Sequence, residues 1–225
     1  MFLSRVQINP GPELFKLLKD GTSSNGYFVH QLLWGLFPNT GDKKRDFLFR
    51  EDNEGGYPRY LVVSDENPVP SNAVSVHCKP YEPKVKKGDH LYFTLTANPV
   101  IARKIEGKKN SVKHDVWMDA KRTAKTSGLK MPELVLACES AVKNWLVNRA
   151  EQNGFLVNPN ELLIDGYLQH RFSKKKSGKE ITFSSVNYAG ILQVNDPEVF
   201  VEKALYKGLG ASKAFGCGLM LVRRA

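Results

Sequence analysis

The order of strand-like and helix-like segments limits the fold of this chain more than any other feature of its sequence. Residues 2–9, FLSRVQIN, alternate between apolar and polar side chains, which is typical of a β-strand. A helix follows, then two strands around a Gly-Gly-Tyr-Pro turn, an ambiguous stretch at 71–77, and a strand at 90–100. The first half therefore reads β, α, β, β, short helix or turn, β, which is the split βαβ order of a ferredoxin-like unit.

The helix predicted in the first half covers residues 26–37, GYFVHQLLWGLF. Asn25 before it is a suitable N-cap. Its apolar residues recur at helical spacing. We expect the core-facing side of this helix to consist of Phe28, Leu32, Leu33 and Leu36.

The second half has a similar order of elements after a basic segment. Residues 103–130 are rich in lysine, arginine, glycine and serine with weak periodicity, so we expect a basic linker or mobile loop. Helix, strand, strand, helix and strand patterns follow at 132–152, 162–172, 181–194, 197–207 and 218–224. One further strand near residue 100 would complete a second unit. We therefore predict an α+β chain of two tandem ferredoxin-like, RRM-like domains, 1–100 and 101–225.

Composition and charge narrow the class of protein and of partner. Hydrophobic residues make up 41% and charged residues 25% of the chain, which is typical of a globular protein. The first residues lack the apolar run of a signal peptide and no stretch approaches the roughly 20 apolar residues of a membrane span, so we expect a cytoplasmic protein. The excess of 33 Lys and Arg over 23 Asp and Glu gives a net charge of +10, which favours a polyanionic partner. A basic surface that only aids solubility is the alternative.

Neither the cysteines nor the histidines have the spacing of a metal site. The three cysteines are far apart and form no CxxC, so we expect buried thiols. Four histidines stand singly, without HxH or HExxH, and are expected at the surface or at strand ends: His77, His90, His114 and His170. We expect no metal and no small-molecule cofactor. His114 is the exception, since it lies beside Lys113 in the basic segment and could contact phosphate.

Two clusters of cations are candidates for binding a polyanionic partner such as RNA. The first lies at the tip and base of the predicted hairpin, where it could follow the phosphates of an RNA stem, although a solvated turn is the alternative: Arg171, Lys174, Lys175, Lys176 and Lys179. The second lies in the basic segment: Arg103, Lys104, Lys108, Lys109, Lys113, Lys121 and Arg122.

The tail GLGASKAFGCG is rich in glycine and does not follow a strand, so it is no dinucleotide-binding loop. Its glycines would let backbone N–H groups approach an anion, and Lys213 adds a cation. A helix-to-strand turn that needs positive φ would explain two of its four glycines: Gly208, Gly210, Gly216 and Gly218.

Several segments together resemble the CasE subfamily of CRISPR repeat-processing endoribonucleases. They are MFLSRVQIN, HQLLWGLFPNTGDKKRDFLFR, LYFTLTANP, KHDVWMDAK and GLGASKAFGCGLMLV, and they extend over essentially the whole chain. The resemblance implies a tandem ferredoxin-like fold of the RAMP superfamily, a hairpin RNA of CRISPR repeats as substrate, and the other subunits of a type I-E Cascade complex as partners. Trp117 departs from the pattern, because a smaller apolar residue is expected there.

The resemblance also implies site residues. The catalytic histidine of the family precedes a Leu-rich run that ends in Leu-Phe-Pro, and His30 in VHQLLWGLFP matches it. A tyrosine one helical turn earlier accompanies it in some members, and Tyr27 matches. The family's Gly-rich loop corresponds to Gly208, Gly210, Gly216 and Gly218 with Lys213.

The chemistry of RNA suits these two residues. RNA carries its own nucleophile, the 2′-OH, and a histidine with an ordinary pKa of about 6.5 can transfer protons near neutral pH. Residues three apart share a helix face, so Tyr27 and His30 could reach one phosphodiester. The expected products are a 2′,3′-cyclic phosphate and a 5′-OH. Alternatives are a packed helix histidine and a tyrosine that staples the helix to the core.

Three functions remain open at this point. The leading one is a metal-independent endoribonuclease that cuts the repeat hairpin and keeps the guide RNA as a complex subunit. The second is a non-catalytic hairpin-RNA-binding module of a ribonucleoprotein complex. A scaffold subunit held by protein contacts ranks last, and it predicts RNA binding with weak salt dependence.

Overall fold

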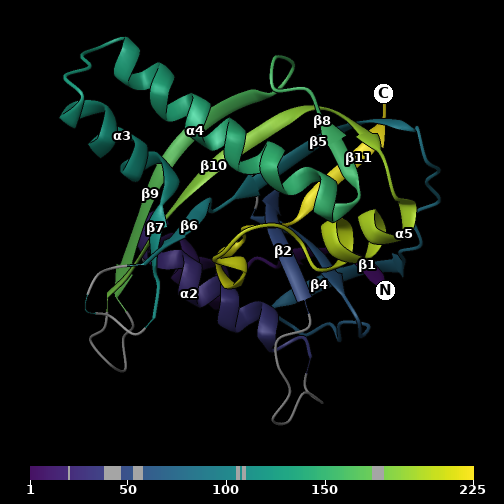
Figure 1. The fold of residues 1–225 in the computed structure, drawn as a ribbon. Coiled ribbons are helices and arrows are strands. Elements are labelled where there is room, and N and C mark those ends of the chain that lie inside the picture. The colour runs from purple at the N-terminus through teal and green to yellow at the C-terminus, as the bar shows by residue number, and fades with distance from the viewer. Residues whose placement is uncertain (20, 38–46, 53–57, 105–106, 108–109, 174–179) are drawn as a thin grey trace.

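Two antiparallel sheets form the body of the protein in the computed structural model, which describes residues 1–19, 21–37, 47–52, 58–104, 107, 110–173 and 180–225 (Figure 1). The first sheet has the order β2-β3-β1-β4. Its strands are β1 (Phe2–Ile8), β2 (Phe47–Asp52), β3 (Arg59–Ser64) and β4 (Val74–Pro80). The helical segment between β1 and β2, and this strand order, are those of a ferredoxin-like unit.

The second sheet has the order β11-β5-β10-β8, and β9 also pairs with β10. Its strands are β5 (His90–Ala97), β8 (Phe155–Val157), β9 (Leu163–Ser173), β10 (Glu180–Val194) and β11 (Met220–Arg224). Its helices are α4 (Glu133–Ala150) and a helix that begins as α5 (Pro197–Val199) and continues as the π-helix η2 (Phe200–Tyr206). This unit is also ferredoxin-like, so the predicted α+β class with two such units is confirmed.

The strand at 90–100 was predicted in the wrong sheet. Instead of closing the first sheet, β5 pairs antiparallel with β10 and β11 of the second sheet. The fourth strand of the first sheet is β4, which comes from the ambiguous stretch and pairs with β1. Alternation indicates that a strand has one buried face, but not which distant strand is its partner. The first sheet ends at Pro80, and the second begins at His90.

The described residues between β1 and β2 form two helices. A short helix, α1 (Pro12–Lys19), occupies a stretch that we did not predict to be helical, and α2 (Gly21–Trp34) begins before the predicted start. The buried face of α2 includes Val29 and Leu33, which pack with Val6 of β1. The predicted core-facing side of this helix is thus partly right. Leu33 and Leu36 are buried, whereas Phe28 and Leu32 are only partly buried.

The basic segment is folded where the structure describes it, so the predicted linker was wrong. It forms a hairpin, β6 (Val100–Arg103) with β7 (Val112–Asp115), and a helix, α3 (Val116–Thr126). Asp115 caps α3 by accepting a hydrogen bond from Met118 N at 2.7 Å. The periodicity is weak because the buried residues of α3 include a carboxylate, Asp119, and a small residue, Ala124.

The two units pack through the face of the first sheet that α2 leaves open. Leu48 of β2 and Val63 of β3 form a buried cluster with Leu219, just before β11. Arg50 of β2 donates a hydrogen bond to Thr94 Oγ1 of β5 at 2.9 Å. The helices α2 and α4 consequently lie on opposite sides of the molecule with the strands between them (Figure 1). None of the helices in the described part of the chain combines the length and apolar character of a membrane span.

Asp119 generates a prediction about acid stability. Its side chain is only 7% exposed and is paired with Arg103 and Arg122. The Arg103 guanidinium, helped by Arg122, holds the pKa of this carboxyl below its usual value. The pairing therefore stabilises the fold fully above the unfolded pKa of about 3.9, and this contribution disappears as pH falls through the lower folded value.

We expect Asp119→Asn to lower the urea midpoint at pH 7, and we expect this difference from the wild type to shrink as the pH falls below about 4. The matched control is Asp165→Asn, since Asp165 lies exposed on β9. A difference between Asp119→Asn and wild type that is equal at pH 7 and pH 3 would contradict this explanation.

Candidate active site

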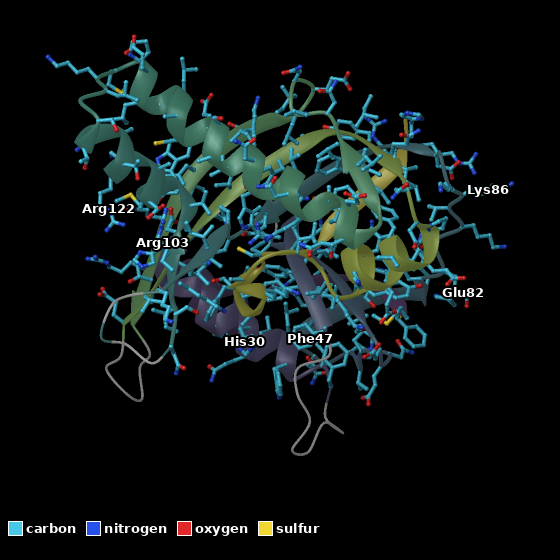
Figure 2. The ribbon with its side chains drawn as sticks, viewed as in Figure 1. His30, Phe47, Glu82, Lys86, Arg103 and Arg122 are labelled. Carbon is cyan, nitrogen blue, oxygen red and sulfur yellow. The ribbon has the colours of Figure 1, made fainter. Side chains whose placement is uncertain are left out.

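His30 lies on α2 where the two units meet. Its half-buried ring is surrounded by three aromatic rings, with centroid distances of 5.7 Å to Trp34, 6.5 Å to Phe47 and 6.3 Å to Phe215. Trp34 is one helical turn further along α2, Phe47 begins β2, and Phe215 belongs to the second unit. His30 and Phe47 lie side by side in Figure 2. Both units thus contribute to the surroundings of this imidazole.

Tyr27 also lies on α2, three residues before His30. The helical backbone places the two positions on one face, as predicted. The Tyr27 side chain is outside the described part of the structure, so its role stays a prediction.

The Gly-rich loop connects η2 to β11 and contains the short 3₁₀-helix η3 (Lys213–Phe215). All four of its predicted glycines have positive φ, between 69° and 97°: Gly208, Gly210, Gly216 and Gly218. Each also lies against other atoms that a side chain would meet within 3.4 Å, such as Asn98 O and Trp145 at Gly210. Folding requirements therefore apply to all four, not to two, and a phosphate contact at Gly208, Gly210 and Gly216 stays a prediction.

Lys213 places a cation in this loop, two residues before Phe215. Its ammonium donates a hydrogen bond to the carbonyl oxygen of Lys207 at 2.6 Å. Because Phe215 contacts His30, the loop brings positive charge to the side of the molecule on which His30 lies.

Three aromatic residues connect His30 to the second sheet, and the sequence patterns did not reveal them. Phe215 stacks on Phe183 of β10 with centroids 5.4 Å apart, and Phe183 stacks on His170 of β9 at 4.6 Å. Burial lowers the pKa of His170, whose Nε2 is hydrogen-bonded to Ser185 Oγ at 2.7 Å. His170 is thus half-buried in a row of rings rather than a surface histidine.

A cleft of about 410 Å³ lies beside this row of rings. Lys113 and Asp115 of β7 line one side, Gln169 and Phe183 line another, and Ser212 of the Gly-rich loop completes the rim. Burial raises the pKa of the Asp115 carboxyl, and hydrogen bonds from the backbone of α3 oppose this rise. Polar and aromatic groups from β7, β9, β10 and the Gly-rich loop therefore converge here.

The predicted RNA-binding cations are only partly described. Lys104 and Lys113 are exposed, while Arg103 pairs with Asp119 and Arg171 Nε lies 3.2 Å from Glu180. His114 has its Nε2 buried without a hydrogen-bond partner among the described residues, which does not favour a phosphate contact at that atom. Several predicted residues lie outside the described part of the chain: Lys108, Lys109, Lys174, Lys175, Lys176 and Lys179.

Trp117, the residue that departs from the family pattern, has a clear packing role. Its ring stacks on Tyr167 of β9 with centroids 4.9 Å apart and planes 15° apart. The large side chain thereby joins the start of α3 to the second sheet.

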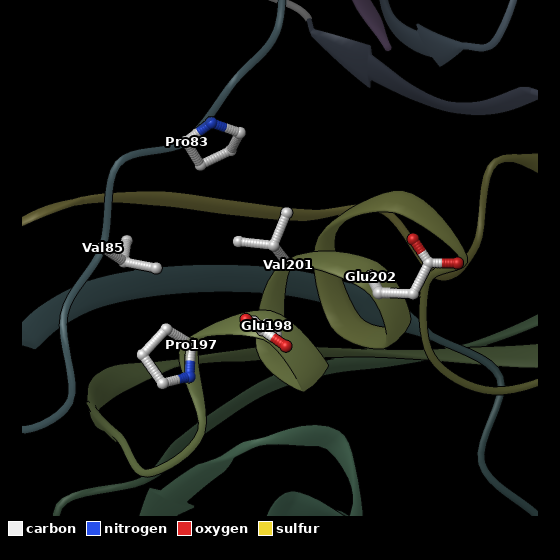
Figure 3. A pocket seen from close by; sticks show the side chains of 6 residues that line it. All are labelled: Pro83, Val85, Pro197, Glu198, Val201 and Glu202. Carbon is white, nitrogen blue, oxygen red and sulfur yellow. The ribbon is translucent and has the colours of Figure 1, made fainter.

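A second cleft, of about 570 Å³, lies between the segment after β4 and the helix α5–η2 (Figure 3). Its walls are apolar, from residues such as Val85 and Val201, and its charged groups are the carboxylates of Glu198 and Glu202. Carboxylates repel phosphate, so this cleft does not suit an RNA backbone.

Comparisons with known proteins identify the family of this chain. A family described as CRISPR associated protein matches residues 1–224. The CRISPR system Cascade subunit CasE of Escherichia coli (strain K12) is 30% identical over 228 residues, covering 98% of each chain. The chain belongs to the CasE subfamily of CRISPR associated proteins. The resemblance predicted from the sequence motifs is thereby confirmed.

Two further relatives are similar to this chain over most of its length. The CRISPR-associated endoribonuclease Cse3 of Thermus thermophilus is 32% identical over 200 residues, covering 85% of this chain and 79% of that protein. A solved structure of CRISPR endoribonuclease Cse3 bound to 19 nt RNA is 25% identical, with a TM-score of 0.68, and covers 99% of this chain and 100% of that one. The similarity thus extends over the whole arrangement of both ferredoxin-like units.

The tight packing of the Gly-rich loop predicts a strong effect of Gly208→Ala. With φ at +69°, a Cβ at this position would lie 2.6 Å from the carbonyl oxygen of Gly218 and 2.7 Å from Leu48 Cδ1. Backbone strain and the clash together should lower the free energy of unfolding by about 3 kcal/mol, measured by urea denaturation.

The matched control is Gly128→Ala after α3, where φ is +78° but nothing lies within 4 Å of the added Cβ. Only the left-handed backbone opposes this change, so the loss should be about 1 kcal/mol. Equal losses in the two variants would mean that the close packing of Gly208 contributes nothing.

Proposed function

We propose that this protein is a metal-independent endoribonuclease that cuts the hairpin repeats of CRISPR precursor RNA and keeps the guide RNA as a subunit of Cascade. One observation carries the proposal: a half-buried histidine lies at the contact of the two units, beside a loop that holds a lysine. The relatives add to it, since one is named an endoribonuclease, one a Cascade subunit, and one solved structure holds RNA. A cytoplasmic location follows from such a substrate.

The reaction needs two proton transfers at one phosphodiester. The 2′-oxygen loses its proton and attacks the phosphorus, the bond from phosphorus to the 5′-oxygen breaks, and that oxygen takes up a proton. The products are a 2′,3′-cyclic phosphate and a 5′-OH. His30 transfers a proton at one of these two oxygens, and Tyr27 orients the 2′-OH or the phosphate. No electron acceptor or metal is needed, because the RNA supplies its own nucleophile.

The RNA lies, in this proposal, across α2 and the Gly-rich loop. Lys213 and the backbone of the loop stabilise the charge that develops on the phosphate. The remaining contacts go to the phosphates of the hairpin stem and come from the following residues: Arg103, Lys104, Lys108, Lys109, Lys113, Arg171, Lys174, Lys175, Lys176 and Lys179. His114 is not among them, because its Nε2 is buried.

The decisive variant is His30→Ala. Removing the proton-transfer group should lower the cleavage rate of repeat RNA by about 10²-fold or more, with RNA affinity within a few fold of wild type. Single-turnover cleavage in EDTA and filter binding measure the two effects. The wild type should cut at equal rates in EDTA and in Mg²⁺.

The matched control is His77→Ala, because His77 lies exposed on β4. It should cut at the wild-type rate. If His30→Ala cuts like the control, the mechanism is wrong. If the wild type binds the hairpin but never cuts it at any pH, the protein is a non-catalytic RNA-binding module.

RNA binding should weaken steeply with salt. Lys113→Ala should reduce the slope of log K against log salt by about 0.7 to 0.9, because one phosphate contact releases about that much counterion. Lys86→Ala should leave the slope unchanged, since Lys86 lies at the far end of the molecule from His30 (Figure 2). A wild-type slope near zero would favour the scaffold role instead.

A further inference from the structure

The cleft of about 410 Å³ next to the row of rings has no role in the reaction described above. It is formed by β7 and the start of α3, by β9 and β10, and by the Gly-rich loop. Its volume falls in the range of sites that hold small molecules, of roughly 300 to 1,000 Å³. A cleft of this size is sufficient for a single nucleobase.

The cleft and the surroundings of His30 share a wall. Phe183 lines the cleft and stacks on Phe215, and Phe215 contacts His30. The Phe183 ring stacks on both Phe215 and His170, and these two contacts hold it in place at the cleft. The rings of Phe215 and Phe183 thereby connect the surroundings of His30 to the lining of the cleft.

One polar group of the cleft, Asp115, favours a base over a phosphate, and the cation of Lys113 lies in the same lining. Asp115 lies in the lining, where it accepts hydrogen bonds from Met118 N and from the hydroxyl of Ser184. A carboxylate repels a phosphate but attracts the N–H groups of a base. Val100 and Met118 add apolar surface to the lining, which suits the flat face of a base.

Gln169 supplies the group most able to distinguish bases. Its side chain is exposed at the cleft and donates a hydrogen bond to Tyr167 Oη at 3.2 Å, which fixes the orientation of the amide. Tyr167 is in turn fixed by stacking on Trp117. An amide oxygen accepts from an exocyclic amino group, which adenine, guanine and cytosine carry and uracil lacks.

The Gly-rich loop forms one wall of the cleft in an unusual backbone conformation. Ser212 has φ +53° and is the one non-glycine residue with positive φ among those described. Asn98 Nδ2 donates a hydrogen bond to its hydroxyl at 2.7 Å. The serine is thereby held at the rim of the cleft, so the wall is formed before any RNA binds.

We propose that this cleft binds one unpaired nucleobase next to the scissile phosphate, and that it selects a base with an exocyclic amino group over uracil. The proposal rests on the proposed function, because it takes the RNA to be a repeat hairpin cut at His30. It deepens that function by naming a second determinant of where the RNA is cut.

The test uses the full-length protein and repeat hairpins that carry a 2′-deoxynucleotide before the cut, which prevents cleavage. Each unpaired nucleotide that flanks the stem, and each nucleotide of the terminal base pair of the stem, is replaced in turn by an abasic residue and by each base. At one flanking position, the abasic residue and uracil should each weaken wild-type binding by about 10-fold, within the range measured for single bases held by proteins.

Gln169→Ala should abolish the preference for an amino-bearing base at that position and leave the other positions unchanged. Gln193→Ala is the matched control, since Gln193 is an exposed glutamine on β10 outside the cleft and should keep the preference. Both glutamines are exposed, so neither change threatens the fold.

Two results would overturn the inference: no position at which Gln169→Ala alters base preference, or an altered preference at a paired nucleotide of the stem. In either case the wild type would still bind and cut the hairpin, so the proposed function would stand. A wild-type protein that neither binds nor cuts repeat hairpins would overturn both.

Discussion

The contact between the two ferredoxin-like units is the constraint on which the rest of the structure depends. Leu48 and Val63 of the first sheet are buried against Leu219, which leads into the edge strand of the second. Part of the apolar surface that α2 does not cover is thereby removed from water. Because Leu219 directly follows the Gly-rich loop, the same contact determines where this loop lies relative to α2.

His30 gains its particular surroundings from this contact. Phe47 belongs to the same sheet as Leu48, and Phe215 belongs to the loop that ends at Leu219. The imidazole is thus held by rings from both units, and a proton-transfer group must be held in place to act on one phosphodiester. In a single ferredoxin-like unit, the histidine on α2 would lack the Phe215 ring and the lysine, Lys213, that the second unit contributes.

Sequence patterns predicted the elements better than their partners. The helical position of His30 and the long hairpin of β9 and β10 follow from local periodicity, which depends on neighbours in sequence. The sheet to which β5 belongs depends on β10, about ninety residues away, and alternation is the same in either sheet. The basic segment was mistaken for a linker because α3 buries Asp119 against arginines, and a paired buried carboxylate has no apolar signature.

The row of rings from His30 to His170 shows why the candidate site was only partly predictable. Its members come from α2, η3, β10 and β9, so no short window of sequence contains two adjacent rings of the row. The same loop carries Phe215 toward His30 and Ser212 toward the cleft. A shift of this loop would therefore move the wall of the proposed catalytic site and the rim of the proposed base site together. In the two proposals, recognition of the base and alignment of the phosphate are coupled through this one loop. Its four positive-φ glycines allow the backbone to follow a tightly packed path.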